Sequence, residues 1–297
     1  MRPMVALVGG AVAIGFAPIF VRWTEVGLNA TAFWRLALAL PALWLLCRRN
    51  GGAVVPRQGG GMLAFAGLCF ALDLCFWHAS IALTTVANAT LLANLTPVVV
   101  VLFYWLVIGQ RPTWRFAAGA TLALAGAAGL ALGSRQPSGG GGSVLLGDLY
   151  GAITAVAYAG YLLAVERARG TAGGFQVMLA STAVATLVTG AVALASGENF
   201  WPASGMGWAV LAGLALLVHV LGQGGIVWAV GQLPATLSSV VILIQPVVAA
   251  GLGWLWLGEA LGLADILCGF LVLAGVVTCQ SRRAPGRNPA PGPAEPG

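Results

Sequence analysis

The sequence has few charged residues and no lysine. Among its 297 residues are 14 arginines and 8 acidic residues, so charged side chains make up 7% of the chain, against about 25% in a soluble domain. Apolar residues make up 59%, and the mean hydropathy is +0.93. A soluble fold with so few charges could not cover this apolar surface. The composition therefore excludes an ordinary soluble enzyme, a disordered chain and a disulfide scaffold, and it predicts a protein that crosses the bilayer several times.

Motifs for nucleotide, metal and nucleic-acid binding are also missing. The arginines occur singly or in pairs, so the net charge of +6 does not form a basic stripe for nucleic acid. The five cysteines lie in apolar runs without a CxxC motif, and neither GxxxxGK[ST] nor HExxH occurs. We therefore expect no metal, no cofactor and no nucleic-acid partner.

The apolar runs are long enough for ten membrane-spanning helices. A helix needs about 20 residues to cross the hydrocarbon core, and it satisfies its own backbone hydrogen bonds there. The expected spans are 4–21, 31–47, 61–83, 86–108, 116–133, 145–165, 175–195, 207–230, 235–257 and 261–281. With the N-terminus in the cytoplasm, eleven arginines of loops and termini lie inside and two lie outside. The positive-inside rule then predicts that both termini are cytoplasmic.

A Gly-rich stretch divides these spans into two sets of five. We expect four segments: a first repeat at 1–133, a linker at 134–144, a second repeat at 145–283 and a disordered cytoplasmic tail at 284–297.

The ends of the two halves resemble each other in sequence. With a shift of 149 residues, 97–126 aligns with 246–275, and Pro97, Trp105 and Gly109 meet identical residues. Since five is an odd number of spans, the two repeats would have opposite orientations, which is typical of transporters that work by alternating access. The expected fold class is an all-α integral membrane protein, with ten transmembrane helices as two inverted five-helix repeats around a central cavity.

Two segments resemble the signature of EamA-type members of the drug/metabolite transporter superfamily. They are IALTTVANATLLANLTPVVVVLFYWLVIG at 81–109 and ATLSSVVILIQPVVAAGLGWLWLGE at 235–259. Each contains a proline helix followed by a glycine turn, with Gln110 in the first half where the family usually has Glu and Glu259 in the second. The Phe33-Trp34-Arg35 stretch also resembles the family's usual arginine position. The turn at Gly109–Arg111, with Trp114, is similar to the aromatic amino acid exporter group.

This resemblance implies export of small metabolites, amino acids or drugs across the bacterial inner membrane. It also implies a central cavity lined by the first, third, fourth, sixth, eighth and ninth helices. A small molecule and the lipid bilayer are the partners that we expect, and two complete halves indicate that a monomer is sufficient for function.

Prolines and ionisable residues near the middle of spans are the candidates for function. Pro97 and Pro246 are each the twelfth residue of their span, where a proline frees a backbone carbonyl and can act as a hinge. Asp73 and His219 are each the thirteenth residue of corresponding spans, and an ionisable group at that depth is costly unless it is paired or hydrated. We consider both for proton coupling, with structural hydrogen bonding as the alternative.

Polar and aromatic residues at helical spacing extend this prediction to a substrate cavity, with bonds between helices as the alternative role. The candidate lining residues are Phe16, Asp73, Trp77, Ser80, Thr90, Asn94, Tyr158, Tyr161, His219, Gln223, Ser239 and Gln245. Arg35 lies five residues into the second span, so its side chain could either extend to the membrane surface or enter the cavity and meet a carboxylate.

The leading function is a secondary transporter that exports amino acids, with aromatic or hydrophobic ones favoured. A multidrug or other metabolite exporter of the same superfamily is the alternative. A passive facilitator or channel would need a selectivity filter or charged ring, which the sequence lacks. An integral-membrane enzyme would need an acid–base or metal site, and the two histidines and few acidic residues make one hard to assemble.

Overall fold

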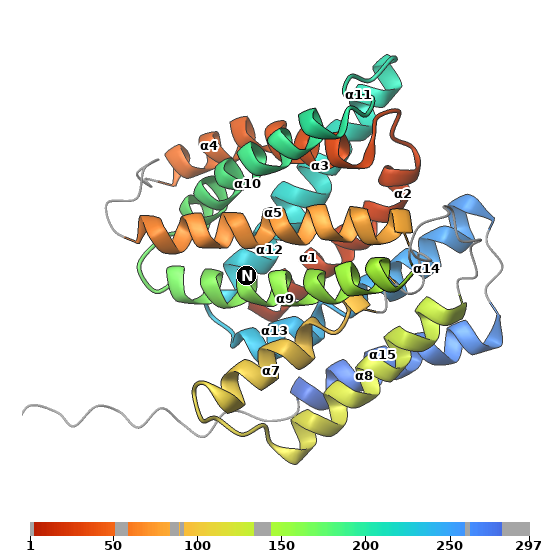
Figure 1. Cartoon of the computed structure of the whole chain (residues 1–297). Helices are drawn as coiled ribbons and strands as arrows, with labels where there is room; N and C mark the ends of the chain where they lie inside the picture. Colours follow the sequence, from red (N-terminus) through yellow and green to blue (C-terminus); the bar gives the residue numbers. More distant parts are fainter. Residues whose placement is uncertain are drawn as a thin grey trace, which may run out of the picture.

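The computed structural model describes residues 3–50, 59–83, 89, 92–133, 144–258 and 262–280. Within these ranges the chain is helical and contains no strand (Figure 1). The helices are α1 (Pro3–Gly15), α2 (Ala17–Arg22), α3 (Leu28–Ala37), α4 (Ala39–Arg49), α5 (Gly60–Leu83), α7 (Thr96–Leu106), α8 (Trp114–Gly133), α9 (Val144–Ala168), α10 (Gly174–Ser196), α11 (Gly205–Gly213), the π-helix η1 (Leu214–Gln223), α12 (Gly224–Val230), α13 (Ala235–Val241), α14 (Ile244–Leu257) and α15 (Leu263–Gln280). The expected tail and nearly all of the expected linker lie outside the described residues.

The lengths and hydropathy of these helices fit a membrane protein. Among the described residues, seven helical stretches are long and apolar enough to cross a bilayer, and two shorter apolar helices, Thr96–Leu106 and Leu263–Cys279, occupy the expected fourth and tenth spans. The 20-residue helix α8 occupies the fifth. Leu187, Leu194 and Phe270 expose large apolar side chains on the outside of the bundle, where lipid would cover them. The prediction of an all-α integral membrane protein is confirmed.

Four of the spans are interrupted close to a proline. The breaks fall at Phe16, Leu38, Asn94–Leu95 and Ile242–Leu243, and a proline follows each of them within three residues. Proline cannot donate the backbone hydrogen bond to the carbonyl four residues earlier, so the helix stops and begins again in a new direction. The fourth and ninth spans break at nearly equivalent positions of the two halves.

Spans of the first half pack against spans of the second half. The third span, α5, packs along the sixth, α9, while the first span, α1, packs against the eighth, η1 and α12. The fifth and tenth spans, α8 and α15, form a pair at one side of the bundle (Figure 1). This packing is the arrangement expected when a two-fold axis relates two five-helix repeats.

Glycines bring α8 and α15 into backbone contact. A Cβ atom built on Gly126 would lie 2.5 Å from the carbonyl oxygen of Cys268 and 2.7 Å from the amide nitrogen of Val272. A Cβ atom on Gly275 would overlap the backbone of Ala123. Small residues at a helix contact give van der Waals packing that holds helices together where lipid removes the hydrophobic driving force.

A carboxylate outside the spans joins two loops. Glu25, in the loop after α2, accepts hydrogen bonds from the hydroxyl and backbone N–H of Ser204 and from the N–H of Ala203 at 2.9 Å. The hydrogen bond from the Ser204 hydroxyl is the largest cause that lowers the pKa of Glu25 below its ordinary value. The start of α11 is thereby held against the connection between the first two spans.

Candidate functional site

A cavity of about 200 Å³ lies inside the bundle, beside the breaks in the fourth and ninth spans. Its lining comes from the first, third, fourth, sixth, eighth and ninth spans, and also from the second span through Arg35. The lining residues are Ile14, Gly15, Ala17, Pro18, Arg35, Phe70, Asp73, Leu74, Trp77, Ala93, Asn94, Thr96, Pro97, Thr154, Tyr158, Gln223, Ser239, Ile242, Leu243, Gln245, Pro246 and Ala249.

Two side chains of opposite charge line this cavity. Asp73 comes from the middle of α5, and Arg35 comes from the last turn of α3. The Arg35 side chain is 8% exposed, and its Nε atom is buried without a hydrogen-bond partner. Asp73 and Arg35 interact electrostatically, but they do not form a direct ion pair within the described part of the chain. Arg35 therefore enters the cavity and does not extend to the membrane surface.

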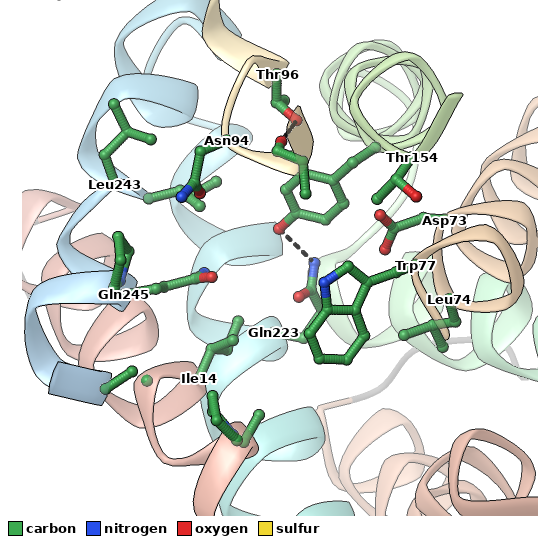
Figure 2. A pocket seen from close by; sticks show the side chains of 18 of the residues that line it. Ile14, Asp73, Leu74, Trp77, Asn94, Thr96, Thr154, Gln223, Leu243 and Gln245 are labelled. Carbon is green, nitrogen blue, oxygen red and sulfur yellow. Dashed lines mark hydrogen bonds between the residues drawn. The ribbon is translucent and has the colours of Figure 1, made fainter. Parts of the chain in front are cut away.

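Amide and hydroxyl groups surround the space between these charges. Gln223, the last residue of η1, donates its side-chain N–H to the hydroxyl of Tyr158 at 3.4 Å. Figure 2 shows Asp73, Trp77 and Gln223 close together, with Asn94 and Gln245 across the cavity from Asp73. The Nδ2 atom of Asn94 is buried without a described partner. The lining thus offers both donors and acceptors to a polar ligand.

Aromatic rings form part of the cavity wall. Phe70, Trp77 and Tyr158 line it directly. Tyr161 lies behind them: its ring is stacked on Tyr158 with centroids 5.7 Å apart, and it lies 4.8 Å from Phe70. Aromatic walls of this kind pack well against apolar or aromatic parts of a ligand.

The two broken spans place their prolines in the cavity wall. Pro97 lies in the first turn of α7, and Pro246 is the third residue of α14. The carbonyls that these prolines leave without a helical donor already have other donors. The Thr96 hydroxyl donates to the Ala93 oxygen at 3.0 Å, and the backbone N–H of Gln245 donates to the Ile242 oxygen at 2.9 Å. Neither carbonyl therefore depends on a substrate for a hydrogen-bond donor, although a carbonyl oxygen can accept a second one.

Several residues expected in the lining lie elsewhere. Ser80 is buried and donates to the Gly147 oxygen at 2.8 Å, and His219 is buried with its Nε2 atom 2.8 Å from the Thr182 hydroxyl. Phe16 packs edge-on against Trp256 with ring centroids 5.8 Å apart. These three residues and Tyr161 are absent from the lining, because the side chain of each contacts a residue of a neighbouring span instead. Thr90 lies outside the described residues.

The other expected lining residues meet at the cavity. The structure brings together Asp73, Trp77, Asn94, Tyr158, Gln223, Ser239 and Gln245. The sequence reasoning did not select several apolar lining positions, or Thr96 and Thr154, and it left Arg35 undecided. Arg35 could have been selected from the sequence, because an arginine within an apolar span is costly unless it has a functional or paired position. Thr154 could not, because its hydroxyl is satisfied by the Tyr150 oxygen within the same helix, α9.

A second polar cluster, the Glu166 cluster, joins three helices near the C-terminal end of α7. Glu166, near the end of α9, accepts a hydrogen bond from the Tyr104 hydroxyl of α7 and another from the Ala235 N–H at the start of α13 at 2.9 Å. Beside it, Val100, Ala159 and Ala235 form a small buried apolar cluster. Together these contacts hold the fourth, sixth and ninth spans against each other.

Comparison with known proteins identifies membrane transporters as the relatives of this chain. The model of the EamA-like transporter family matches residues 1–132 and again 145–279. The pseudopaline exporter from two strains of Pseudomonas aeruginosa is 31% identical over 251 residues, which cover 83% of each chain. One solved crystal structure superposes with a TM-score of 0.78 at 20% identity, covering 94% of this chain and 98% of the other. At that identity the likeness concerns the fold alone.

Proposed function

Because the chain belongs to the EamA-like transporter family and is an exporter of small metabolites rather than an enzyme, we propose that it moves amino acids out of the cell. The observation that carries this proposal is the cavity. Its volume of about 200 Å³ lies below the range of about 300–1,000 Å³ that is usual for drug-sized ligands. Its wall combines charged, amide and aromatic groups, which suits a small molecule with both polar and apolar parts.

We propose that transport proceeds by alternating access. The cavity lies between the two sets of spans, and the breaks beside Pro97 and Pro246 supply positions where backbone direction can change without breaking a continuous helix. The Glu166 cluster would close the cytoplasmic end in the state described here and would have to open in the other state. We propose 1–133 and 145–283 as the two inverted repeats of this scheme, each supplying spans to both sides of the cavity.

Energy coupling is a further part of the proposal. Asp73 is the candidate for proton coupling, because it is an ionisable group in the cavity wall at the middle of a span. His219 is a weaker candidate, since its ring lies outside the lining and is hydrogen-bonded to Thr182.

We place the protein in the bacterial inner membrane as a monomer with both termini in the cytoplasm, on the basis of the loop arginines and the two complete halves.

Larger substrates form the alternative. The similarity to a pseudopaline exporter favours pseudopaline as a second candidate, and drugs are a third. Either would require the cavity to expand in another state of the transport cycle, whereas an amino acid fits the volume described here.

Counterflow in proteoliposomes tests the proposal. The purified chain would be reconstituted into vesicles loaded with one unlabelled amino acid, and entry of radiolabelled amino acids would be followed, with pseudopaline, drugs and nucleobases as competitors. We expect saturable entry that is accelerated by amino acid on the opposite side. Transport restricted to aromatic amino acids would support the narrower resemblance. Entry that never saturates would indicate a channel, and competition by pseudopaline but by no amino acid would refute the proposed substrate class.

A further inference from the structure

Asp73 and Arg35 are the two formally charged side chains among the described residues that line the cavity. They come from different spans, α5 and α3, and they interact through the field in the cavity without a direct ion pair. The wall of the cavity therefore carries one negative and one positive group, separated from each other, with no net charge.

This separation is costly unless something else meets the two charges. A charged group taken out of water needs a partner close enough to hydrogen bond with it. Arg35 has five N–H donors in a fixed fork, yet its Nε atom is buried without a partner and its side chain is 8% exposed. The protein therefore leaves the Nε donor of this buried guanidinium without a hydrogen bond.

We propose that Arg35 and Asp73 together bind a zwitterion, with the substrate carboxylate on Arg35 and the substrate ammonium on Asp73. The inference rests on the proposed function and names the part of the amino acid that each residue recognises. A guanidinium binds a carboxylate through two parallel N–H···O bonds, which a lysine cannot form. The aromatic wall of Phe70, Trp77 and Tyr158 then faces the substrate side chain. A cavity with one charge of each sign favours a substrate whose own charges cancel over a simple anion or cation.

The alternative is that the two charges balance each other and have no contact with substrate. The two readings differ in how they respond to changes in the ligand. A zwitterion site loses affinity when either the carboxylate or the ammonium is removed from the ligand. A purely structural charge pair has no reason to distinguish such ligands.

The experiment compares three ligands that share one side chain. Counterflow of radiolabelled L-phenylalanine would be measured with unlabelled L-phenylalanine, L-phenylalaninamide (which lacks the carboxylate) and 3-phenylpropanoate (which lacks the ammonium) as competitors. L-leucine with leucinamide and 4-methylpentanoate forms a parallel set. For the unmodified protein we expect each incomplete ligand to compete about tenfold to a hundredfold more weakly than the amino acid, the range for loss of a hydrogen-bonded charge pair.

Two substitutions then assign each end of the ligand to one residue. Arg35→Gln should weaken L-phenylalanine by a similar factor while leaving L-phenylalaninamide unchanged. Asp73→Asn should weaken L-phenylalanine while leaving 3-phenylpropanoate unchanged. Arg115→Gln, at an exposed arginine near the start of α8, is the matched control and should change neither. Arg35→Lys keeps the charge, loses the fork and should give an intermediate loss.

The outcomes separate this inference from the proposed function. If the unmodified protein transports L-phenylalanine or L-leucine but the amide and the carboxylate analogues compete equally well, the zwitterion site is refuted and the amino acid exporter stands. This arm needs no variant, so poor folding of Arg35→Gln cannot obscure it. Equal weakening of all three ligands by both substitutions would also refute the assignment. If neither amino acid is transported or competes, the proposed function and the zwitterion site both fail.

Discussion

Removing one hydroxyl from the Glu166 cluster, which we propose closes one end of the cavity, should open the cavity on that side more often. The Tyr104 hydroxyl donates to one oxygen of Glu166, whose other oxygen accepts from the Ala235 N–H at 2.9 Å. The perturbation is Tyr104→Phe, which keeps the ring and deletes the donor. Because α7, α9 and α13 meet through this carboxylate, the loss of one bond weakens the closed arrangement directly.

The size of the effect follows from the kind of bond that is lost. A hydrogen bond to a charged group contributes about 1.5–3 kcal/mol in proteins, and polar bonds between membrane helices contribute about 0.6–2 kcal/mol. Since the Glu166 carboxylate keeps its bond to Ala235, a loss of about 1–2 kcal/mol is reasonable. This loss shifts the ratio of open to closed molecules by about 5–30-fold.

The assay is chemical labelling of a cysteine placed behind the closure. Val100 is fully buried in the apolar cluster beside Glu166, so Val100→Cys in a background without the native cysteines should react slowly with a membrane-impermeant maleimide. Adding Tyr104→Phe should accelerate labelling about 5–30-fold. Tyr150→Phe, on the same helix as Glu166 but near its other end, is the control and should leave the rate unchanged. Equal rates in the Tyr104 and Tyr150 variants would show that the Glu166 cluster does not hold the cavity closed.

Three other predictions concern packing, pH and coupling. Gly126→Ala should lower the stability of the α8–α15 pair by about 1–3 kcal/mol, because its Cβ would meet backbone atoms. Gly251→Ala, with open space around it, is the control and should not lower stability. Thermal unfolding in detergent measures both variants, and equal melting temperatures would contradict the packing argument. Because hydrogen bonds lower the pKa of Glu25, its contribution is fully present above the ordinary value of 4.5 and is lost as the pH falls through the lowered value. Amide exchange at Ser204, corrected for the intrinsic rate, should therefore rise below pH 4.5, and a rise centred at or above that pH would refute the assignment. His219→Gln should leave the pH dependence of transport unchanged, since the ring is buried outside the cavity lining; a lost pH response in vesicles would restore it as a coupling residue.

The spans and their breaks could be predicted from local sequence. In lipid each helix must satisfy its own backbone hydrogen bonds, so a long apolar run is enough to indicate a span. Proline interrupts a helix wherever it occurs in the interior, and Pro97 and Pro246 do so in corresponding spans. The carbonyls before these prolines are also satisfied locally, since the Thr96 hydroxyl and the backbone N–H of Gln245 each lie three residues further along the chain.

The residues that line the cavity could be predicted from the sequence only in part. A polar residue within a span must face the interior of the bundle. This rule selects Asp73, Asn94 and Gln223, which line the cavity, but also Ser80 and His219, which do not. The interior contains both the cavity and the contacts between helices, and helical spacing does not distinguish them. Ser80 and His219 have a carbonyl and a hydroxyl of neighbouring spans within reach, and these partners are far away in sequence.

The sequence by itself thus determined that the chain is a helical membrane protein, where its helices break, and which side chains point inward, since each depends on groups within a few residues. The tertiary structure decided how those inward residues divide between packing and cavity. It also turned Arg35 into the cavity and left its Nε atom without a hydrogen-bond partner. The physical reason is that a buried polar group is defined by its nearest partner, and in this bundle those partners come from other spans whose positions depend on packing between helices.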